Sequence, residues 1–264
     1  MKTRTILMWV ITLAAVMIFA ACGDKESGDL STPDHTHQWG AWAVTTPATC
    51  TTAGVETRVC DLDATHVETR PIAAIEHTWN TETGLCTVCS SLMYSLGETG
   101  PGGGKIFYVF AGGFTMTDNS QVCHYLEAAP SDQSTGTPWG GHGTTITGIT
   151  TFTSKTDPNA IMIGNGRKDT QLIVDYLRDN TGETGRAAQL CKSYTGGGCT
   201  DWFLPSCGEL YQLYSSSVGN MTTDWYWSSS QYDGNYAWYQ RFNLGYQGNL
   251  SKNVALYVRA IRAF

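Results

Sequence analysis

The sequence is poor in charged residues and contains no basic run. Charged side chains make up 15% of its 264 residues, with 16 Lys and Arg against 23 Asp and Glu, so the formal net charge is −7. Nucleic acid and anionic lipid both recruit proteins through clustered positive charge. We therefore expect no nucleic-acid partner, and electrostatic docking on a membrane is disfavoured.

Long apolar runs are also scarce, because only the N-terminus carries one. Residues 6–21 are apolar apart from one Thr, follow Lys2 and Arg4, and end directly before Cys22. The run is roughly 16 residues, shorter than the 18 to 20 that span a bilayer. A basic start, a short apolar core and small residues before a cysteine resemble a lipoprotein signal. We predict a signal peptide over 1–21 and lipidation of Cys22; the alternative is an ordinary signal peptide with an incidental cysteine.

A polar segment and an even set of cysteines follow. Residues 22–36 are rich in Gly, Ser and Asp and lack a hydrophobic period, which predicts a flexible tether. Nine cysteines are present, and eight remain when Cys22 is set aside, as disulfide pairing in an exported protein would require. Four precede Tyr94 and four follow it. The even count on each side predicts a domain boundary there.

Residues 37–93 contain a degenerate repeat and form a predicted small, β-rich module. The triplet H-x-W begins at His37 and again at His77, and Thr/Val-rich segments lie between them. The segment resembles short H-x-W and C-x-x-C repeats of bacterial surface proteins. A module this small needs a covalent or metal staple. The weak metal candidates are Cys60, His66, Cys86 and Cys89; the competing possibility is disulfides, for example Cys50 with Cys60. Two observations favour disulfides. The compartment is oxidising, and Asp63 replaces the second cysteine of the first C-x-x-C.

Residues 94–264 predict a larger α+β domain. Helices are expected over 170–180 and 186–194, and a third follows a capping box of Ser206 and Glu209. Strands are expected over 225–229, 236–242 and 256–262, separated by turns at 233–235 and 245–248, as a terminal antiparallel meander. The glycine-rich segment 100–104 (GPGGG) precedes a strand instead of a helix, so it indicates a turn and not a phosphate loop.

Five ordered motifs of this domain carry a family resemblance: GETGPGGGKIFYV, YLEAAP, TDWFLPSxxEL, YWSSSxY and VRAIRAF. Together they resemble the C-terminal domain of the Lcl adhesin family, which implies a C-type-lectin-like fold, distantly similar to sulfatase-modifying (formylglycine-generating) enzymes. The calcium-dependent sugar motifs Glu-Pro-Asn and Trp-Asn-Asp are missing. Ala263 stands where an oxidase of this fold would need a reactive cysteine.

Candidate residues in the larger domain belong to three groups. Aromatic side chains beside polar turns are typical of sugar or peptide binding, and the candidates are Tyr232, Asp233, Asn235, Tyr236, Tyr246 and Gln247. Cys199 and Cys207 bracket one short strand and are the first disulfide candidates, with Cys123 and Cys191 as the complement. The serines 228–230, His124, His142, Glu127 and Glu209 lack catalytic companions, so we predict no catalytic residue and no cofactor.

The leading hypothesis is therefore a non-enzymatic binding or adhesion protein. It would be anchored to the membrane by its N-terminal lipid, exposed on the outer surface or in the periplasm, and would bind a glycan or an extracellular-matrix protein. Two alternatives stay open: an enzyme of the sulfatase-modifying-type fold, and a structural envelope protein without a soluble ligand.

Overall fold

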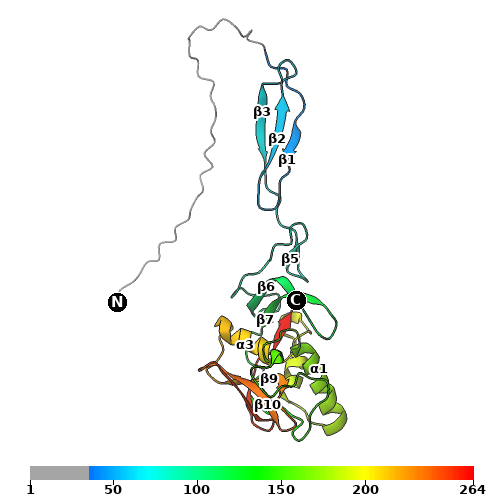
Figure 1. Cartoon of the computed structure of the whole chain (residues 1–264), viewed down its shortest axis with the longest axis vertical. Coiled ribbons are helices and arrows are strands. Elements are labelled where there is room, and N and C mark those ends of the chain that lie inside the picture. The colour runs from blue at the N-terminus through cyan, green and yellow to red at the C-terminus, as the bar shows by residue number, and fades with distance from the viewer. Residues whose placement is uncertain (1–35) are drawn as a thin grey trace, which may run out of the picture. The chain divides into compact units, whose positions relative to one another are not determined.

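The computed structural model describes residues 36–264 (Figure 1). The predicted signal peptide, Cys22 and the tether lie outside these residues. The described chain forms two compact units: residues up to 43 with 57–69, and residues 44–56 with 70–264. In this part of the chain no helix is both long and apolar enough to cross a membrane.

Short strands build the cysteine-containing segment. Three of them form a sheet in the order β1-β2-β3, with β1 at Ala43–Thr46, β2 at Gly54–Val59 and β3 at Val67–Ile72. β1 and most of β3 are exposed, so the sheet buries little apolar area. A two-stranded ladder of β4 (Trp79–Asn80) and β5 (Leu85–Cys86) follows. The predicted β-rich character of this segment is confirmed, and its apolar core is small.

Residues 84–94, which precede the predicted boundary or lie at it, pack on the larger domain. The Tyr125 hydroxyl donates to the Gly84 carbonyl at 2.9 Å and accepts from the Met93 N–H at 2.8 Å. The Tyr94 ring packs edge-on against Tyr125 and Phe264. These aromatic contacts place residues 70–93 in the same compact unit as the C-terminal domain.

Two sheets form the larger domain. The first has the order β13-β7-β6, from β6 (Lys105–Thr115), β7 (Val122–Ala128) and β13 (Ile261–Ala263). The second has the order β11-β10-β9-β12-β8. Its strands are β8 (Ser134–Thr137), β9 (Trp225–Gln231), β10 (Tyr236–Arg241), β11 (Tyr246–Ser251) and β12 (Leu256–Val258).

Three α-helices cover these sheets: α1 (Gly166–Tyr176), α2 (Ala187–Ser193) and α3 (Cys207–Ser216). A π-helical turn, η2 (Leu177–Thr181), extends α1, and short 3₁₀ turns lie at η1 (Pro158–Ala160) and η3 (Gly196–Gly198). The capping box that starts α3 is confirmed. The Ser206 hydroxyl accepts from the Glu209 N–H, and the Glu209 carboxylate accepts from the Ser206 N–H.

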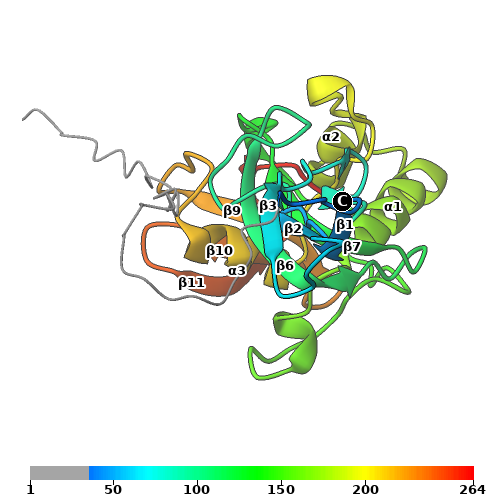
Figure 2. The same cartoon turned by 90° about the horizontal axis from the view of Figure 1, so that it is seen from above.

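The core lies on both faces of the five-stranded sheet. Side chains alternate along a strand, and Tyr226 of β9 packs in a cluster with Leu210 and Leu213 of α3. The next residue, Trp227, packs in a cluster with Ile173 of α1 and residues of α2. Accordingly, α1 and α3 lie on opposite sides of the unit, with α2 beside α1 (Figures 1 and 2). The α+β class is confirmed.

The terminal meander differs from the prediction in two places. A turn was expected at residues 245–248, but β11 starts there and pairs antiparallel with β10. The single strand expected over 256–262 is split: β12 pairs parallel with β9, whereas β13 joins β7 in the other sheet. Arg259 lies at the break, and its guanidinium donates to Asp132 (2.7 Å) and to the carbonyls of Ala129 and Gly219.

The predicted disulfides are not formed, because the cysteines of residues 36–264 pack into different places. Cys123 lies in the cluster under α3, and Cys191 lies in the cluster under α1. Cys207 packs with Phe152 and Trp238 in a third cluster, whereas Cys199 is half-buried beside the α1 cluster. None of the eight cysteines described is in a disulfide. Cys50 does not pair with Cys60, since its sulfur faces Cys86.

Candidate metal centre

Four side chains of the second unit converge on one point: Cys50, His77, Cys86 and Cys89. Cys50 lies on the loop between β1 and β2. The Thr49 hydroxyl shapes that loop by accepting from the N–H groups of Thr51 and Thr52. The Thr49 carbonyl then accepts from the Ile75 N–H at 2.9 Å. This bond ties the Cys50 loop to the segment that leads into His77.

The β4–β5 ladder positions His77 and Cys86. Trp79 is the register partner of Cys86, and the Thr87 N–H donates to the Thr78 carbonyl at 2.8 Å. The His77 ring stacks on Trp79, with centroids 4.7 Å apart and planes 19° apart. The H-x-W triplet therefore has a local function: its tryptophan holds the imidazole, two residues away, beside the first cysteine of C-x-x-C.

A tight turn presents both cysteines of C-x-x-C on one side. The Ser90 N–H donates to the Cys86 carbonyl at 2.9 Å, and the Cys86 N–H donates to the Ser91 carbonyl at 2.9 Å. Ser90 adopts a left-handed conformation with φ of 56° to close this turn. Such a turn brings two thiolates to one metal ion.

The distances match the edges of a metal tetrahedron. The ligand atoms all lie within 4.8 Å of one another. The sulfur atoms of Cys50 and Cys86 are 3.9 Å apart, and Cys89 Sγ lies 3.4 Å from His77 Nδ1. Zinc bonds of about 2.3 Å to sulfur and 2.0 to 2.1 Å to nitrogen give tetrahedral edges of about 3.8 and 3.6 Å. A disulfide would need about 2.05 Å between sulfurs.

The electrostatics of the cluster suit a cation. Burial opposes ionisation of Cys86, but the N–H groups of Cys89 and Val88 and the His77 ring more than offset it and lower the Cys86 pKa to about 5. Burial, together with the neighbouring thiols, raises the pKa of Cys50 to about 11. The contact with Cys86 raises the pKa of His77. Ionisation of one thiol thus opposes ionisation of its neighbour. A bound divalent cation would remove this repulsion between thiolates.

The metal set expected from the sequence combined residues of two separate groups. Cys86 and Cys89 belong with Cys50 and His77, whereas Cys60 and His66 belong with His37. Cys50 was assigned to a disulfide, and neither histidine of the H-x-W triplets was recognised as a ligand. The signal was present, since each triplet precedes a C-x-x-C or C-x-x-D.

The structure divides the predicted ligand-binding residues of the α+β domain into two groups. Asp233 Oδ1 accepts from the N–H groups of Asn235 and Tyr236 and so closes their turn. Tyr232 lies near Tyr236 and packs on Trp238. The register places Tyr236 opposite Ser251 and Tyr246 opposite Arg241. Tyr246 therefore lies at the other end of the hairpin, about 17 Å away at 3.4 Å per residue.

The second group also has partners of its own. The Lys155 ammonium lies over the Tyr246 ring, 3.7 Å from its centroid. Gln247 Nε2 donates to the Cys207 carbonyl at 3.0 Å. These contacts fix the start of β11 against α3 and leave the two groups without a shared surface.

Several polar side chains considered for catalysis have structural partners, whereas the buried Ser229 hydroxyl has no hydrogen-bond partner among the described residues. The Ser228 hydroxyl donates to the Trp238 carbonyl, and the Ser230 hydroxyl accepts from the Cys207 N–H. The Glu127 carboxylate accepts from the N–H groups of Gly102 and Gly104, which fastens the predicted glycine turn before β6. Ala263 is buried in β13, opposite Leu126 of β7.

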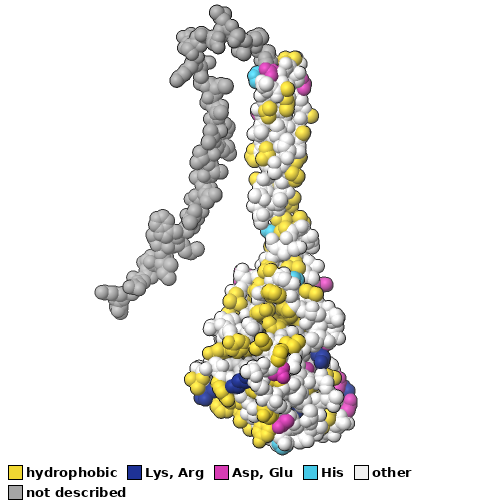
Figure 3. Space-filling model, viewed as in Figure 1, with side chains coloured by type: hydrophobic (Ala, Val, Ile, Leu, Met, Phe, Trp, Pro, Cys, Tyr) yellow, Lys and Arg dark blue, Asp and Glu magenta, His cyan; other side chains and the backbone are white. Residues whose placement is uncertain are grey.

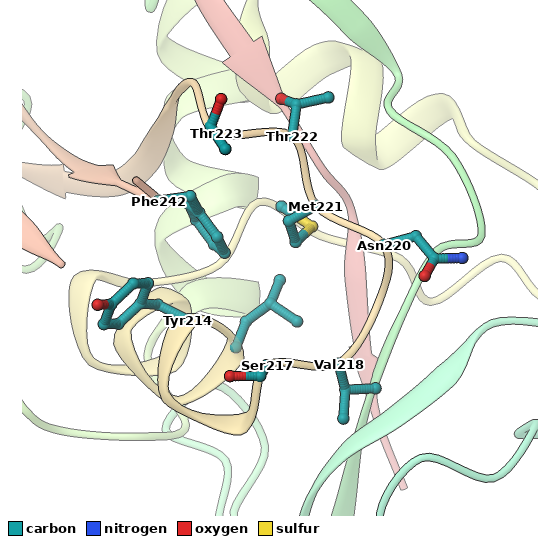
Figure 4. A pocket seen from close by; sticks show the side chains of 9 residues that line it. Tyr214, Ser217, Val218, Asn220, Met221, Thr222, Thr223 and Phe242 are labelled. Carbon is teal, nitrogen blue, oxygen red and sulfur yellow. The ribbon is translucent and has the colours of Figure 1, made fainter. Parts of the chain in front are cut away.

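A cavity of about 240 Å³ lies between the end of α3 and Phe242 (Figure 4). Tyr214, Met221 and Phe242 supply apolar walls, and Asn220 and Thr223 lie at its polar edge. Elsewhere on this unit, apolar side chains gather over β6, as Figure 3 shows. Phe110 of β6 is 47% exposed there. The cavity combines aromatic faces with hydrogen-bonding groups.

Comparisons with known proteins add one distant similarity. No family model matches the chain, and no curated protein matches it. Among solved structures it is similar to a fimbrial protein from Bacteroides ovatus ATCC 8483, with 12% identity and a TM-score of 0.47. The alignment covers 81% of this chain and 57% of that protein, so the chain spans less than two thirds of it. A likeness of this extent assigns neither a fold family nor a function to this chain.

Proposed function

We propose that this chain is an exported, lipid-anchored binding protein whose cysteine-containing segment is held together by a zinc ion on Cys50, His77, Cys86 and Cys89. The observation that carries the metal assignment is the geometry of those four ligands. Three thiolates and one imidazole, with ligand atoms all within 4.8 Å of one another, are typical of structural zinc. The strands around them bury too little apolar area to be stable alone. Zinc binding therefore supplies the folding energy of this segment.

Metal analysis of the full-length chain in detergent tests this proposal. The wild type should retain zinc through dialysis against a weak chelator, because a closed site of three thiolates binds tightly. Cys86→Ser should lose this tightly held zinc. Cys199→Ser is the matched control, since this half-buried cysteine lies outside the cluster, and it should retain the metal. Tightly held zinc that is equal in all three proteins would contradict the assignment.

The ligand-binding part of the proposal concerns residues 94–264, which we take to have a C-type-lectin-like fold. The ordered motifs shared with the Lcl C-terminal domain support that fold and a glycan or matrix-protein ligand. The cavity at Tyr214 and Phe242 supports binding, because aromatic walls beside polar groups suit sugar rings and peptide segments. The structural partners of Glu127, Ser228 and Ser230 support a role without catalysis.

An array of glycans and matrix proteins, probed with the full-length chain, tests the binding role. Thr223→Arg places a long side chain at the mouth of the cavity and should weaken binding of any ligand that the wild type captures by at least tenfold. Thr153→Arg makes the same change at an exposed position elsewhere and should bind as the wild type does. Absence of a captured ligand, or equal binding by both variants, would favour a structural envelope protein.

A further inference from the structure

The framework of the zinc centre occurs a second time, in the first unit. Trp39 is the bridge partner of Cys60, as Trp79 is of Cys86. The Asp61 N–H donates to the Gln38 carbonyl at 2.7 Å, as the Thr87 N–H donates to the Thr78 carbonyl at 2.8 Å. Four residues thus form the same backbone arrangement in each unit, although their sequences have diverged.

The histidine of the first triplet is held in the same way as His77. Its ring stacks on Trp39, with centroids 4.8 Å apart and planes 22° apart, close to the 4.7 Å and 19° of the second pair. Arg58 also lies over the rings of Trp39 and Trp42 and pairs with Glu68, so the tryptophan has a second contact that holds it. His37 is therefore oriented beside the first cysteine of its C-x-x-D segment.

The donor set of this second framework differs by two substitutions. Asp63 stands where the second unit has Cys89, and no counterpart of Cys50 is present in the group. His66 takes part instead: its ring lies edge-on to His37, with centroids 4.7 Å apart. The ligand atoms of His37, Cys60 and His66 all lie within 4.8 Å of one another. Cys60 is buried, His37 is exposed and His66 is half-buried.

We propose that His37, Cys60 and His66 form a second zinc site with three protein ligands and an exchangeable fourth position. Two imidazoles and one thiolate are a donor set that zinc accepts, and sites with three protein ligands keep an open position for water or an external donor. The Asp63 carboxylate, 3.8 Å from His66 Nε2, orients that imidazole from outside the ligand shell. Zinc here binds more weakly than at the three-thiolate centre and exchanges with solution.

Cobalt loading of the full-length chain in detergent separates the two sites. Tetrahedral Co²⁺ reports thiolate ligands through charge-transfer absorption, which grows with the number of thiolates. We expect about two Co²⁺ per chain in the wild type and about one in Cys86→Ser. The charge-transfer absorption of Cys86→Ser should correspond to about one thiolate ligand. In the Cys86→Ser background, His37→Ala and His66→Ala should each lower the affinity for the remaining Co²⁺ by tenfold or more. His142→Ala, an exposed histidine outside both groups, is the control and should change nothing.

A gain of ligand tests the same site without destroying it. Asp63→Cys restores the full C-x-x-C, so the remaining Co²⁺ in the Cys86→Ser background should bind about tenfold more tightly, with absorption of about two thiolates. A Cys86→Ser chain that binds no Co²⁺, or that is indifferent to the His37, His66 and Asp63 substitutions, would overturn the second site. The zinc centre at Cys50 is tested separately, because it predicts that the wild type binds one more metal ion than Cys86→Ser.

Discussion

The sulfur atoms of Cys50 and Cys86 lie 3.9 Å apart, although 36 residues separate them in the sequence. This distance is too long for a disulfide and close to the edge of a zinc–thiolate tetrahedron. The two residues come from different segments, one from the β1–β2 loop and one from β5. A shared ion would therefore cross-link parts of the chain that few apolar contacts hold together.

Metal removal should change the reactivity of the cluster cysteines. Zinc-bound thiolates react slowly with alkylating reagents, so a strong chelator should speed modification of Cys50, Cys86 and Cys89 by about tenfold or more. Cys123 and Cys191 serve as internal controls, because both are fully buried in the α+β domain. Peptide mass spectrometry of the full-length chain measures each site. Equal rates with and without chelator at all three cluster cysteines would contradict a bound metal.

Removing the Tyr125 hydroxyl should destabilise the described chain. Tyr125→Phe leaves the Gly84 carbonyl and the N–H groups of Met93 and Tyr94 without their partner. The expected loss is about 1 to 3 kcal/mol in the free energy of unfolding, as for a buried polar group left unsatisfied. Urea unfolding measures the loss, with the exposed Tyr211→Phe as control. A loss of no more than the control shows would mean that residues 84–94 do not depend on this contact.

Stability should fall as the pH rises from about 4 to about 7 because of Asp169. Burial raises the pKa of its carboxyl to about 7, although Thr150 donates an N–H to one oxygen at 3.0 Å. The folded state therefore holds a proton that the unfolded chain releases near its ordinary value of 3.8. Folding is favoured below that value, and the advantage is lost as the pH rises through 7.

Asp169→Asn should flatten this pH dependence and raise stability at pH 8. A gain of about 1 to 3 kcal/mol is expected, since one pKa unit corresponds to about 1.4 kcal/mol and relaxation lowers the full effect. Urea unfolding at several pH values, compared with Asp175→Asn on the same helix, measures the gain. If the wild type and Asp169→Asn show the same slope, the carboxyl titrates normally.

The membrane anchor is tested by metabolic labelling with palmitate. The wild type should incorporate label, and Cys22→Ala should not, because the thiol of Cys22 is the expected site of lipid attachment. The Cys199→Ser variant should be labelled as strongly as the wild type. Labelling of Cys22→Ala at the wild-type level would contradict lipid attachment at Cys22.

Local signals in the sequence predicted the elements of the α+β domain well. The capping box of Ser206 and Glu209 starts α3 as expected, because both of its hydrogen bonds lie within four residues. Trp202 and Trp227 are fully buried, in keeping with the high average burial of large aromatic side chains.

Long-range contacts were missed, because they depend on which segments meet in space. Arg259, which lies between β12 and β13, pairs with Asp132, and the two residues are far apart in the sequence. The metal groups were mixed for the same reason: Cys60 and Cys86 have similar neighbours in the sequence, and only the fold assigns Cys50 to one of them. Tyr246 was grouped with Tyr236 because strand β11 was taken for a turn.

The most direct test of the account is zinc X-ray absorption on the full-length His66→Ala chain, in which only the four-ligand centre should hold metal. The first shell should contain three sulfurs at about 2.3 Å and one nitrogen at about 2.0 to 2.1 Å. Loss of this signal in the additional Cys50→Ser variant would tie it to the predicted cluster. A chain that holds no zinc and carries a disulfide between Cys50 and Cys86 would contradict the central claim.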